Sequence, residues 1–295
     1  MRAGGSLNPA RLAVEDLAQH LLRGAARVRT IPPGDARLAP SFLVIGGQRC
    51  GTTSPYSYLI EHPLVVQSLV KEAHFFDNHF DRGGAWYSGY FPSQFYGRFV
   101  ERRFGRKPIT GEASPYYLFH PLAAERVARL LPDVKLIVLL RDPVARAWSH
   151  YSHEVAKGFE ALSFEEAIEC EERRLDGELE RMVSDPSYRS FNAQHYSYLA
   201  RGRYIDQIER WREHFPAEQL LTMNSSGLFS DPEAALNRVL RFLGLPPTRL
   251  RAYPKHNTYR HRPLGEETRR RLREYFAEPN RRLYEYVGTD YGWGS

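Results

Sequence analysis

The sequence predicts a single α/β domain whose parallel sheet is covered by helices on both faces. Continuously apolar runs rich in β-branched residues occur at 41–46 and 135–140, as expected for strands buried on both faces. Weaker strand patterns lie at 64–67, 109–112 and 220–223. Helical patterns separate these runs, and strands that alternate with helices are typical of a parallel sheet because parallel neighbours need a crossover connection.

The helical patterns account for most of the remaining chain. They lie at 52–61, 121–131, 143–157, 163–182, 203–214, 231–243 and 266–286. The last stretch contains Pro279, so we expect a helix or helix pair that breaks there. No linker divides residues 41–295, which are expected to form one domain. Residues 1–40 combine an amphipathic helical pattern with a Pro/Gly linker and are expected to be an appendage.

The composition narrows the class of protein. With 42 % hydrophobic residues, the 295-residue chain has enough apolar material for a core, which excludes general disorder. Its two cysteines, Cys50 and Cys170, do not support a disulfide framework, which favours a reducing compartment. No apolar run approaches the roughly 20 residues of a membrane helix, and no secretory signal is evident. We therefore expect a cytoplasmic protein without a membrane span.

Charge is unevenly distributed along the chain. The segment 154–186 has eleven Asp and Glu against four Lys and Arg, a local charge of −7, whereas the whole chain is +6 and the remainder therefore +13. This distribution indicates a basic body that receives an anion, with an acidic helical insertion as a lid on the acceptor side. Nucleic-acid binding is the alternative, but no helix-turn-helix, zinc finger or basic aromatic sheet supports it, so no nucleic-acid partner is expected.

A glycine-containing loop joins the first predicted strand to the next helix. Gly46, Gly51 and Thr53 match the phosphate-loop pattern G-x-x-x-x-G-K-[ST], and a strand–loop–helix junction of this kind is an anion site. The pattern's lysine is replaced by Thr52, while a cation, Arg49, stands earlier in the loop. The fold is therefore expected to resemble the P-loop NTPases. A kinase or NTPase and a turn without a ligand remain alternatives.

A second candidate phosphate site follows the strand at 135–140. Arg141 stands at its carboxyl end, where open α/β sheets bind ligands, and its guanidinium fork suits a phosphate. Asp142 is expected to cap the next helix with Pro143 as its first residue, and Ser149 lies two turns further on. Two separated phosphate sites imply a nucleotide that is phosphorylated at both ends. His150 and His153 lack a third ligand motif, so no metal site is expected.

Three segments, 48–54, 71–77 and 140–149, together resemble one family. Their sequences are QRCGTTS, KEAHFFD and LRDPVARAWS, and in this order they are similar to the PAPS-dependent sulfotransferases, most closely the heparan-sulfate-type branch and its bacterial relatives. PAPS is 3′-phosphoadenosine 5′-phosphosulfate. The resemblance extends from about residue 41 to Trp293. It includes GEASPY at 111–116, RGRY at 201–204 and FAEPN at 276–280.

The resemblance implies roles for individual residues. The 5′-phosphosulfate of PAPS is expected at Arg49, Cys50, Gly51, Thr52, Thr53 and Ser54, and the 3′-phosphate at Arg141, Ser149 and Arg260. The acceptor side is expected to include Asp77, Ser114, Tyr116, Tyr196 and Ser197. A cleft lined by Tyr116, Phe119, Tyr196 and Tyr198 suits many hydroxyl compounds.

Catalysis is assigned to Glu72, His74 and Arg49 on the same basis. Glu72 is the expected general base and His74 its partner; a surface ion pair of Glu72 with Lys71 and a core hydrogen bond of His74 are the alternatives. Arg49 stands where most relatives have lysine, and because a guanidinium hardly releases a proton, we interpret it as an electrostatic clamp. Ala113 replaces a lysine of the heparan-sulfate enzymes, which weakens the case for a sulfated polysaccharide acceptor.

The sequence thus predicts transfer of the sulfonate of PAPS to a hydroxyl group, which releases PAP and needs no metal. The acceptor is expected to be a small molecule, a glycan or a lipid. A P-loop kinase or NTPase and a non-catalytic polyanion-binding protein of the same fold are the alternative functions.

Overall fold

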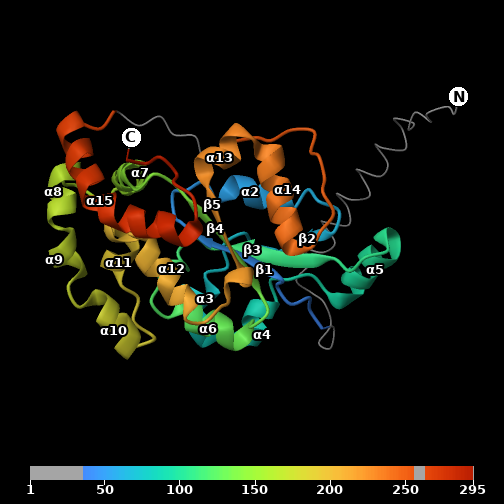
Figure 1. Ribbon diagram of the computed structural model, residues 1–295. Helices are drawn as coiled ribbons and strands as arrows, with labels where there is room; N and C mark the ends of the chain where they lie inside the picture. The colour runs from blue at the N-terminus through green and yellow to red at the C-terminus, as the bar shows by residue number, and fades with distance from the viewer. Residues whose placement is uncertain (1–35, 256–262, 295) are drawn as a thin grey trace, which may run out of the picture.

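The computed structural model of the protein describes residues 36–255 and 263–294 (Figure 1). One parallel sheet of five strands has the order β2-β3-β1-β4-β5. The strands are β1 (Phe42–Gly46), β2 (Val65–Gln67), β3 (Ile109–Ala113), β4 (Lys135–Leu140) and β5 (Leu220–Asn224). In the centre of the sheet, Phe42 of β1 is paired with Gly111 of β3 and with Lys135 of β4. The five predicted strands and their parallel arrangement are confirmed.

Helices cover both faces of this sheet, as the apolar runs predict. On β1, Leu43 and Ile45 belong to one core, whereas Phe42 and Val44 belong to the other. The helices of the first core are α3 (Phe75–Asn78), α6 (Ala123–Leu130), α12 (Tyr204–Arg212) and part of α15 (Glu266–Val287). Those of the second are α2 (Thr53–Leu59), α5 (Gln94–Phe104) and α14 (Pro232–Leu243). In Figure 1 α2 and α14 lie above the sheet, and α3, α6 and α12 lie below it.

A third layer of short helices extends the fold beyond β4 and β5, at the left of Figure 1. It comprises α7 (Pro143–Ala156), α8 (Phe164–Glu169), α9 (Glu171–Leu175), α10 (Glu178–Ser184) and α11 (Phe191–His195). Val144 of α7, Phe164 of α8 and Phe276 of α15 pack together in its core. The remaining helices are α4 (Gly83–Ser88) and α13 (Ser225–Ser230), with 3₁₀ turns at Phe80–Arg82, Ala200–Gly202 and Ala217–Gln219.

The stretch 163–182, predicted to be helical, is divided into α8, α9 and α10, and Gly177 before α10 has the left-handed φ of 69° that interrupts a helix. One helix prediction was wrong. The helix α15 continues through Pro279 instead of breaking there. Pro279 lacks one backbone donor, but it is itself buried between Phe276 and Leu283, and their packing stabilises the unbroken helix.

The acidic segment 154–186 is helical, but several of its carboxylates are internal. Glu154, Glu160 and Glu171 are each at most 5 % exposed. Glu160 accepts hydrogen bonds from Arg174 and Tyr198, and Glu171 accepts the backbone N–H groups of residues 199 and 200. These carboxylates therefore connect the segment to the domain and do not add to the charge of its surface.

Most of the expected appendage 1–40 lies outside the described residues, as does Arg260. Residues 36–38 run along the start of α5, where the amide of Gln94 donates to the carbonyl of Ala36 at 2.7 Å and Leu38 donates to Pro92. Within the described part of the chain, no helix combines the length and the apolar composition needed to cross a membrane.

Candidate active site

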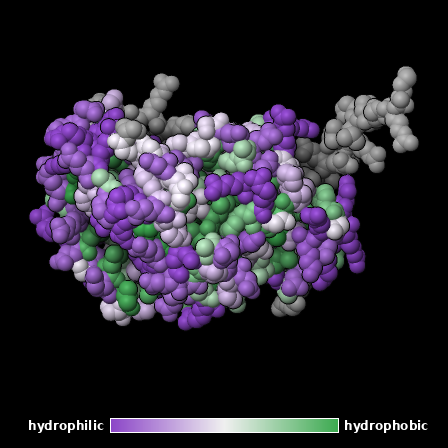
Figure 2. Space-filling model, viewed as in Figure 1, coloured by the Kyte–Doolittle hydropathy of each residue, from purple (hydrophilic) through white to green (hydrophobic). Residues whose placement is uncertain are grey.

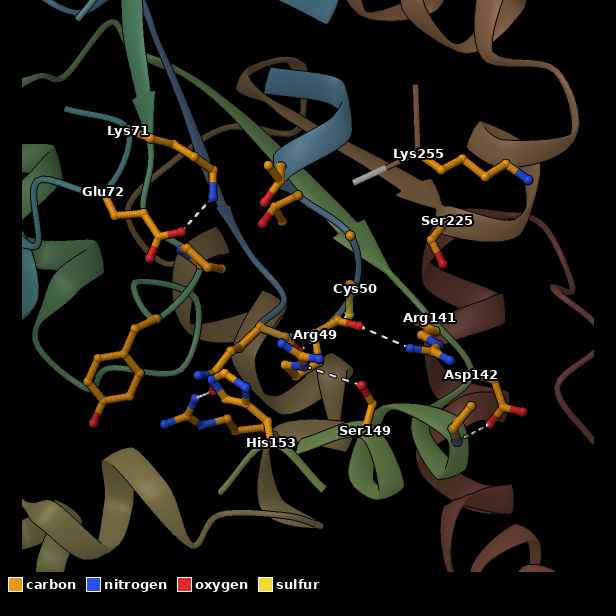
Figure 3. Close-up of a pocket in the computed structure, with 18 of the residues that line it drawn as sticks. Arg49, Cys50, Lys71, Glu72, Arg141, Asp142, Ser149, His153, Ser225 and Lys255 are labelled. Carbon is orange, nitrogen blue, oxygen red and sulfur yellow. Dashed lines mark hydrogen bonds and ion pairs between the residues drawn. The ribbon is translucent and has the colours of Figure 1, made fainter. Parts of the chain in front are cut away.

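A cavity of about 720 Å³ lies at the edge of the sheet where the strands end. Segments that follow each of the five strands contribute to its wall: 48–53 after β1, 71–74 after β2, 115–116 after β3, 141–153 after β4 and 225–229 after β5. This is the place where parallel α/β sheets bind ligands. Figure 3 shows the phosphate loop between two groups of polar side chains in this cavity.

The loop after β1 contributes backbone donors and one cation. Residues Gln48 to Thr53 all line the cavity at the junction of strand, loop and helix, where proteins commonly bind anions. Gly51 has a φ of 85°, and a Cβ there would lie 2.9 Å from the ring of Phe229, so glycine is required. Arg49 is also left-handed, with a φ of 67°.

Arg49, which follows β1, and Arg141, which follows β4, are linked by a hydrogen bond. Arg49 donates from Nε to Ser149 Oγ at 3.2 Å, and Arg141 donates from NH1 to the Arg49 carbonyl at 3.4 Å (Figure 3). Asp142 caps α7 by accepting the amide of Val144 at 2.9 Å, with Pro143 as the first helical residue, which confirms the predicted cap. Two guanidinium groups and a hydroxyl thus stand together, as two phosphate groups require.

The segment that carries Glu72 is tied to β3 beside the loop. The amide of Ala113 donates to the carbonyl of Lys71 at 2.8 Å, and the amide of His74 donates to Ser114 Oγ at 3.3 Å. Ser114 in turn donates to the buried carboxylate of Glu112 at 2.7 Å. These contacts place the side chains of Lys71, Glu72 and His74 in the cavity wall.

Glu72 lies between two cationic groups. Lys71 Nζ is 2.5 Å from Glu72 Oε1, and His74 Nε2 is 3.4 Å from Oε2. Burial alone would raise the pKa of Glu72, but the hydrogen bond from His74 and the charge of Lys71 lower it to about 2. Burial alone would lower the pKa of His74, but Asp77, 2.7 Å from Nδ1, and Glu72 raise it to about 10. At neutral pH the pair therefore consists of a carboxylate and an imidazolium.

A buried arginine lines the cavity beside Tyr116. Arg201 is only 3 % exposed, contacts Gln48 Oε1 and donates to the carbonyls of Ala193 at 2.7 Å and Gln194 at 2.9 Å. Its guanidinium lies 4.5 Å from the centre of the Tyr116 ring. It thereby joins the phosphate loop to α11 and the 3₁₀ turn at Ala200–Gly202.

Further polar groups line the two ends of the cavity. His153 and Lys157, one helical turn apart after Ser149, lie on the same side as Gln194. The other end has Ser225 and Ser226 of α13, together with Phe229 and Lys255; Figure 3 shows Ser225 and Lys255 beyond the phosphate loop.

The structure brings most of the residues assigned from the sequence to this one cavity. Those that line it are Arg49, Cys50, Gly51, Thr52, Thr53, Glu72, His74, Tyr116, Arg141 and Ser149. Those that do not line it are Ser54, Asp77, Ser114, Phe119, Tyr196, Ser197 and Tyr198. Asp77 and Ser114 instead hold His74, while Ser197 is buried and donates to Ala193. Tyr196 donates to Phe159 outside the cavity.

The sequence interpretation assigned no role at the site to Gln48, His153, Lys157, Gln194 and Arg201. His153 and Lys157 stand four and eight residues after Ser149, so a helix through these positions places all three on one face. This spacing could have predicted that they line the same cavity as Ser149. Nothing local to the sequence marks Gln194. In the described part of the chain, no three His, Cys, Asp or Glu side chains form a metal-binding group.

Comparison with known proteins identifies the family of this fold and site. The family model described as "Sulfotransferase domain" matches residues 39–262. The chain therefore belongs to the sulfotransferase domain family and is an enzyme that transfers a sulfonate group. The predicted family, enzyme class and P-loop NTPase-like fold are confirmed.

Particular relatives support this assignment. The chain is 30 % identical to the human heparan sulfate glucosamine 3-O-sulfotransferase 3A1, over 90 % of this chain and 67 % of the relative. It is 29 % identical to the human heparan sulfate glucosamine 3-O-sulfotransferase 6, of which the alignment covers 75 %. A sulfotransferase crystal structure from Alicyclobacillus acidocaldarius superposes with a TM-score of 0.63 at 29 % identity, covering 87 % of this chain and 99 % of that one.

Proposed function

We propose that the enzyme transfers the sulfonate of PAPS to a hydroxyl group of its acceptor, giving a sulfate ester and PAP. The observation that supports this proposal most directly is the arrangement of one cavity. It holds the phosphate loop, the linked pair Arg49 and Arg141, and the carboxylate of Glu72. The loop and the two arginines suit a donor that has phosphate groups at both ends of a nucleoside. Arg49 is also the charge-stabilising clamp, and Glu72 is the base.

The donor side suits the charges of PAPS. The first turn of α2 and Arg49 suit the 5′-phosphosulfate, and Arg141 with Ser149 suits a 3′-phosphate. Phe229 lines the cavity beside Gly51 and offers an apolar ring for contact with the adenine. Thr52 stands where a nucleoside triphosphatase has its lysine, which disfavours ATP.

The chemistry follows from the side chains. PAPS supplies the sulfonate: its sulfur–oxygen bond to the phosphate breaks as a bond from sulfur to the acceptor oxygen forms. Glu72, ionised at neutral pH, takes the proton of the acceptor hydroxyl. Arg49 neutralises charge that develops on the departing phosphate but keeps its own proton, because guanidinium is too weak an acid to donate it.

The acceptor side is cationic. Lys71, Lys157 and Arg201 line it around Tyr116. These groups favour an acceptor whose polar part accepts hydrogen bonds, such as a sugar or a small polyol, in keeping with the glycan acceptors that the names of the human relatives specify.

We also propose that the enzyme works in a reducing compartment, the cytoplasm. Cys50 and Cys170 are both free thiols, and Cys50 is buried inside the phosphate loop. Fractionation of cells that express the protein tests this: recovery with secreted or membrane-enclosed material contradicts it.

Nucleotide binding and transfer of labelled sulfonate test the proposed function. At a hundred times its dissociation constant, PAP is expected to stabilise the folded protein by about 2.7 kcal/mol, a rise in Tm of several degrees that exceeds the effects of AMP and ATP. Transfer from ³⁵S-labelled PAPS to a panel of hydroxyl compounds without added metal then measures activity. Equal shifts with all three nucleotides, or a shift only with Mg-ATP, contradict the proposal and favour a kinase. PAP binding without transfer to any acceptor favours the non-catalytic protein.

A further inference from the structure

Two phenylalanine rings lie on the surface at the acceptor end of the site. Phe159, just after α7, is 42 % exposed, and Phe191, at the start of α11, is 47 % exposed. Their ring centres are 5.6 Å apart, and the ring of His195 lies against both, at 4.7 Å from Phe159 and 4.3 Å from Phe191. We call Phe159, Phe191 and His195 the aromatic rim. Figure 2 shows a largely hydrophilic surface on which hydrophobic side chains reach the solvent in places, including over α10 and α11.

The aromatic rim is held in place by polar contacts, one of which is to a buried carboxylate. His195 Nδ1 is 2.8 Å from the buried carboxylate of Glu154, and the hydroxyl of Tyr196 donates to the carbonyl of Phe159 at 2.8 Å. Ser190 caps α11 by accepting the amide of Ala193 at 2.9 Å. A preorganised apolar surface binds a ligand with little further loss of conformational entropy.

Both chain segments that carry the aromatic rim, the one that follows α7 and the helix α11, also contribute a residue to the cavity wall. Lys157 lines the cavity, and its Nζ lies 5.9 Å from the centre of the Phe159 ring. Gln194 also lines the cavity and stands three residues after Phe191, on the same side of α11. A molecule whose polar part reaches Lys157 and Gln194 therefore meets the two phenyl rings where it leaves the cavity.

We propose that the acceptor is an amphiphile: a hydroxyl-bearing polar head bound in the cavity and an apolar segment that lies on the aromatic rim. The proposal rests on the proposed function and specifies its acceptor. The cavity wall between Glu72 and Arg201 is polar and cationic, so it suits the head. The two exposed rings, by contrast, do not add to the binding free energy of a purely hydrophilic chain. They favour binding of an alkyl or aryl segment, because that contact removes apolar surface from water.

A homologous series of alkyl β-D-glucosides, from methyl to octyl, tests this below the concentration at which micelles form. Complete burial of a methylene improves binding about fourfold, and a surface that covers one side of the chain gives about half of that free energy, or about twofold per methylene. Binding to the enzyme–PAP complex, measured without turnover, is expected to tighten about twofold per methylene over the first four to six carbons. Phenyl β-D-glucoside, compared with the hexyl compound, distinguishes an aryl from an alkyl segment.

Two variants give the comparison its controls. The double variant Phe159→Ser, Phe191→Ser is expected to remove the dependence on chain length while PAP still raises its Tm as in the wild type. Phe95→Ser removes a phenyl ring that is more exposed, at 70 %, on α5 at the opposite side of the molecule, and is expected to leave the chain-length dependence intact (Figure 1).

The outcomes separate this proposal from the proposed function. Absence of PAP binding contradicts the function itself. If PAP binds, three results overturn the amphiphilic acceptor alone. They are no chain-length dependence in the wild type, no binding of any glucoside, and the same chain-length dependence in the double variant. Loss of the dependence in Phe95→Ser also overturns it, because the apolar segment then binds elsewhere.

Discussion

Replacement of Glu72 by glutamine removes the proposed base with almost no change in side-chain size. In the wild type, Glu72 accepts contacts from Lys71 at 2.5 Å and from His74 at 3.4 Å, and it faces the cavity. The amide keeps the shape but has no lone pair basic enough to take the hydroxyl proton. General-base catalysis contributes about 10²- to 10⁴-fold, so kcat with an aliphatic alcohol acceptor is expected to fall by that factor. PAP affinity is expected to change little.

The same change has a small, separate effect on stability. The pKa of Glu72 is lowered from about 4.5 to about 2, which by itself corresponds to about 3 kcal/mol. Its side chain is 38 % exposed, however, so screening by solvent reduces this to about 1 kcal/mol. This stability is present above pH 4.5 and is lost as the pH falls towards 2. At pH 7 the variant is therefore expected to melt only about 2–4 °C lower, too little to explain a hundredfold loss of rate.

The assay is single-turnover transfer of labelled sulfonate, with PAP binding measured in parallel. Lys71→Met is the matched control: it breaks the same ion pair but keeps the carboxylate, and its kcat is expected to stay within about tenfold of the wild type, since the base remains. Near-wild-type turnover of Glu72→Gln would falsify the assignment. His74, the other catalytic candidate, could then serve as the base only after losing the proton that Asp77 and Glu72 stabilise on it. Loss of PAP binding together with turnover would show that Glu72 has a structural role. An acidic phenol acceptor, already partly ionised, is expected to lose less activity than an alcohol.

Three further predictions follow from the geometry. Arg141→Ala is expected to weaken PAP binding about tenfold or more and AMP binding little, as measured by calorimetry, because Arg141 is assigned to the 3′-phosphate; equal losses contradict that assignment. Burial raises the pKa of Glu112 from 4.5 to about 7, so the wild type is expected to lose about 3 kcal/mol of stability as the pH rises through this window. Denaturant unfolding at pH 5 and pH 8 should show that loss reduced in Glu112→Gln; an unchanged pH dependence contradicts it. Arg270→Ala, which breaks exposed ion pairs to Glu267 and Glu274 on α15, is expected to leave both Tm and kcat unchanged; a clear effect on either would show that this surface is not simply solvated.

The sheet was predictable from the sequence because its strands are continuously apolar. Strands at 42–46 and 135–140 are buried on both faces, and no other local structure buries so short an apolar run as well. The errors occur where tertiary packing overrides local preference, as at Pro279 in α15. The helix α5 was not expected from the sequence: Tyr96 and Val100 pack on the second core, but the neighbouring Phe95 and Phe99 face solvent, so its apolar residues do not form one core-facing stripe.

The donor half of the site was predictable for a different reason. Its parts are short contiguous segments, the loop after β1 and the start of α7, so sequence spacing alone specifies them. The acceptor half is assembled from Tyr116, Lys157 and Arg201, which come from three separate segments and meet only in the folded chain. Asp77 and Ser114 were assigned to the acceptor side from the sequence but do not line the cavity. Their residue types suit a binding site, but in the structure their polar atoms contact His74.

The arrangement of charges explains how one cavity keeps a base and a clamp apart. Arg141 is bonded to Arg49 and Arg49 to Ser149, whereas Glu72 is paired with Lys71 away from them (Figure 3). His74 is the second cation beside Glu72. If Glu72 paired with Arg49 instead, each would neutralise the other, and neither the hydroxyl proton nor the departing phosphate would have a partner. The parallel sheet places the two groups of cations on different sides. The Glu72 segment follows β2 and is hydrogen-bonded to β3, whereas Arg141 follows β4, and β3 and β4 lie on opposite sides of β1.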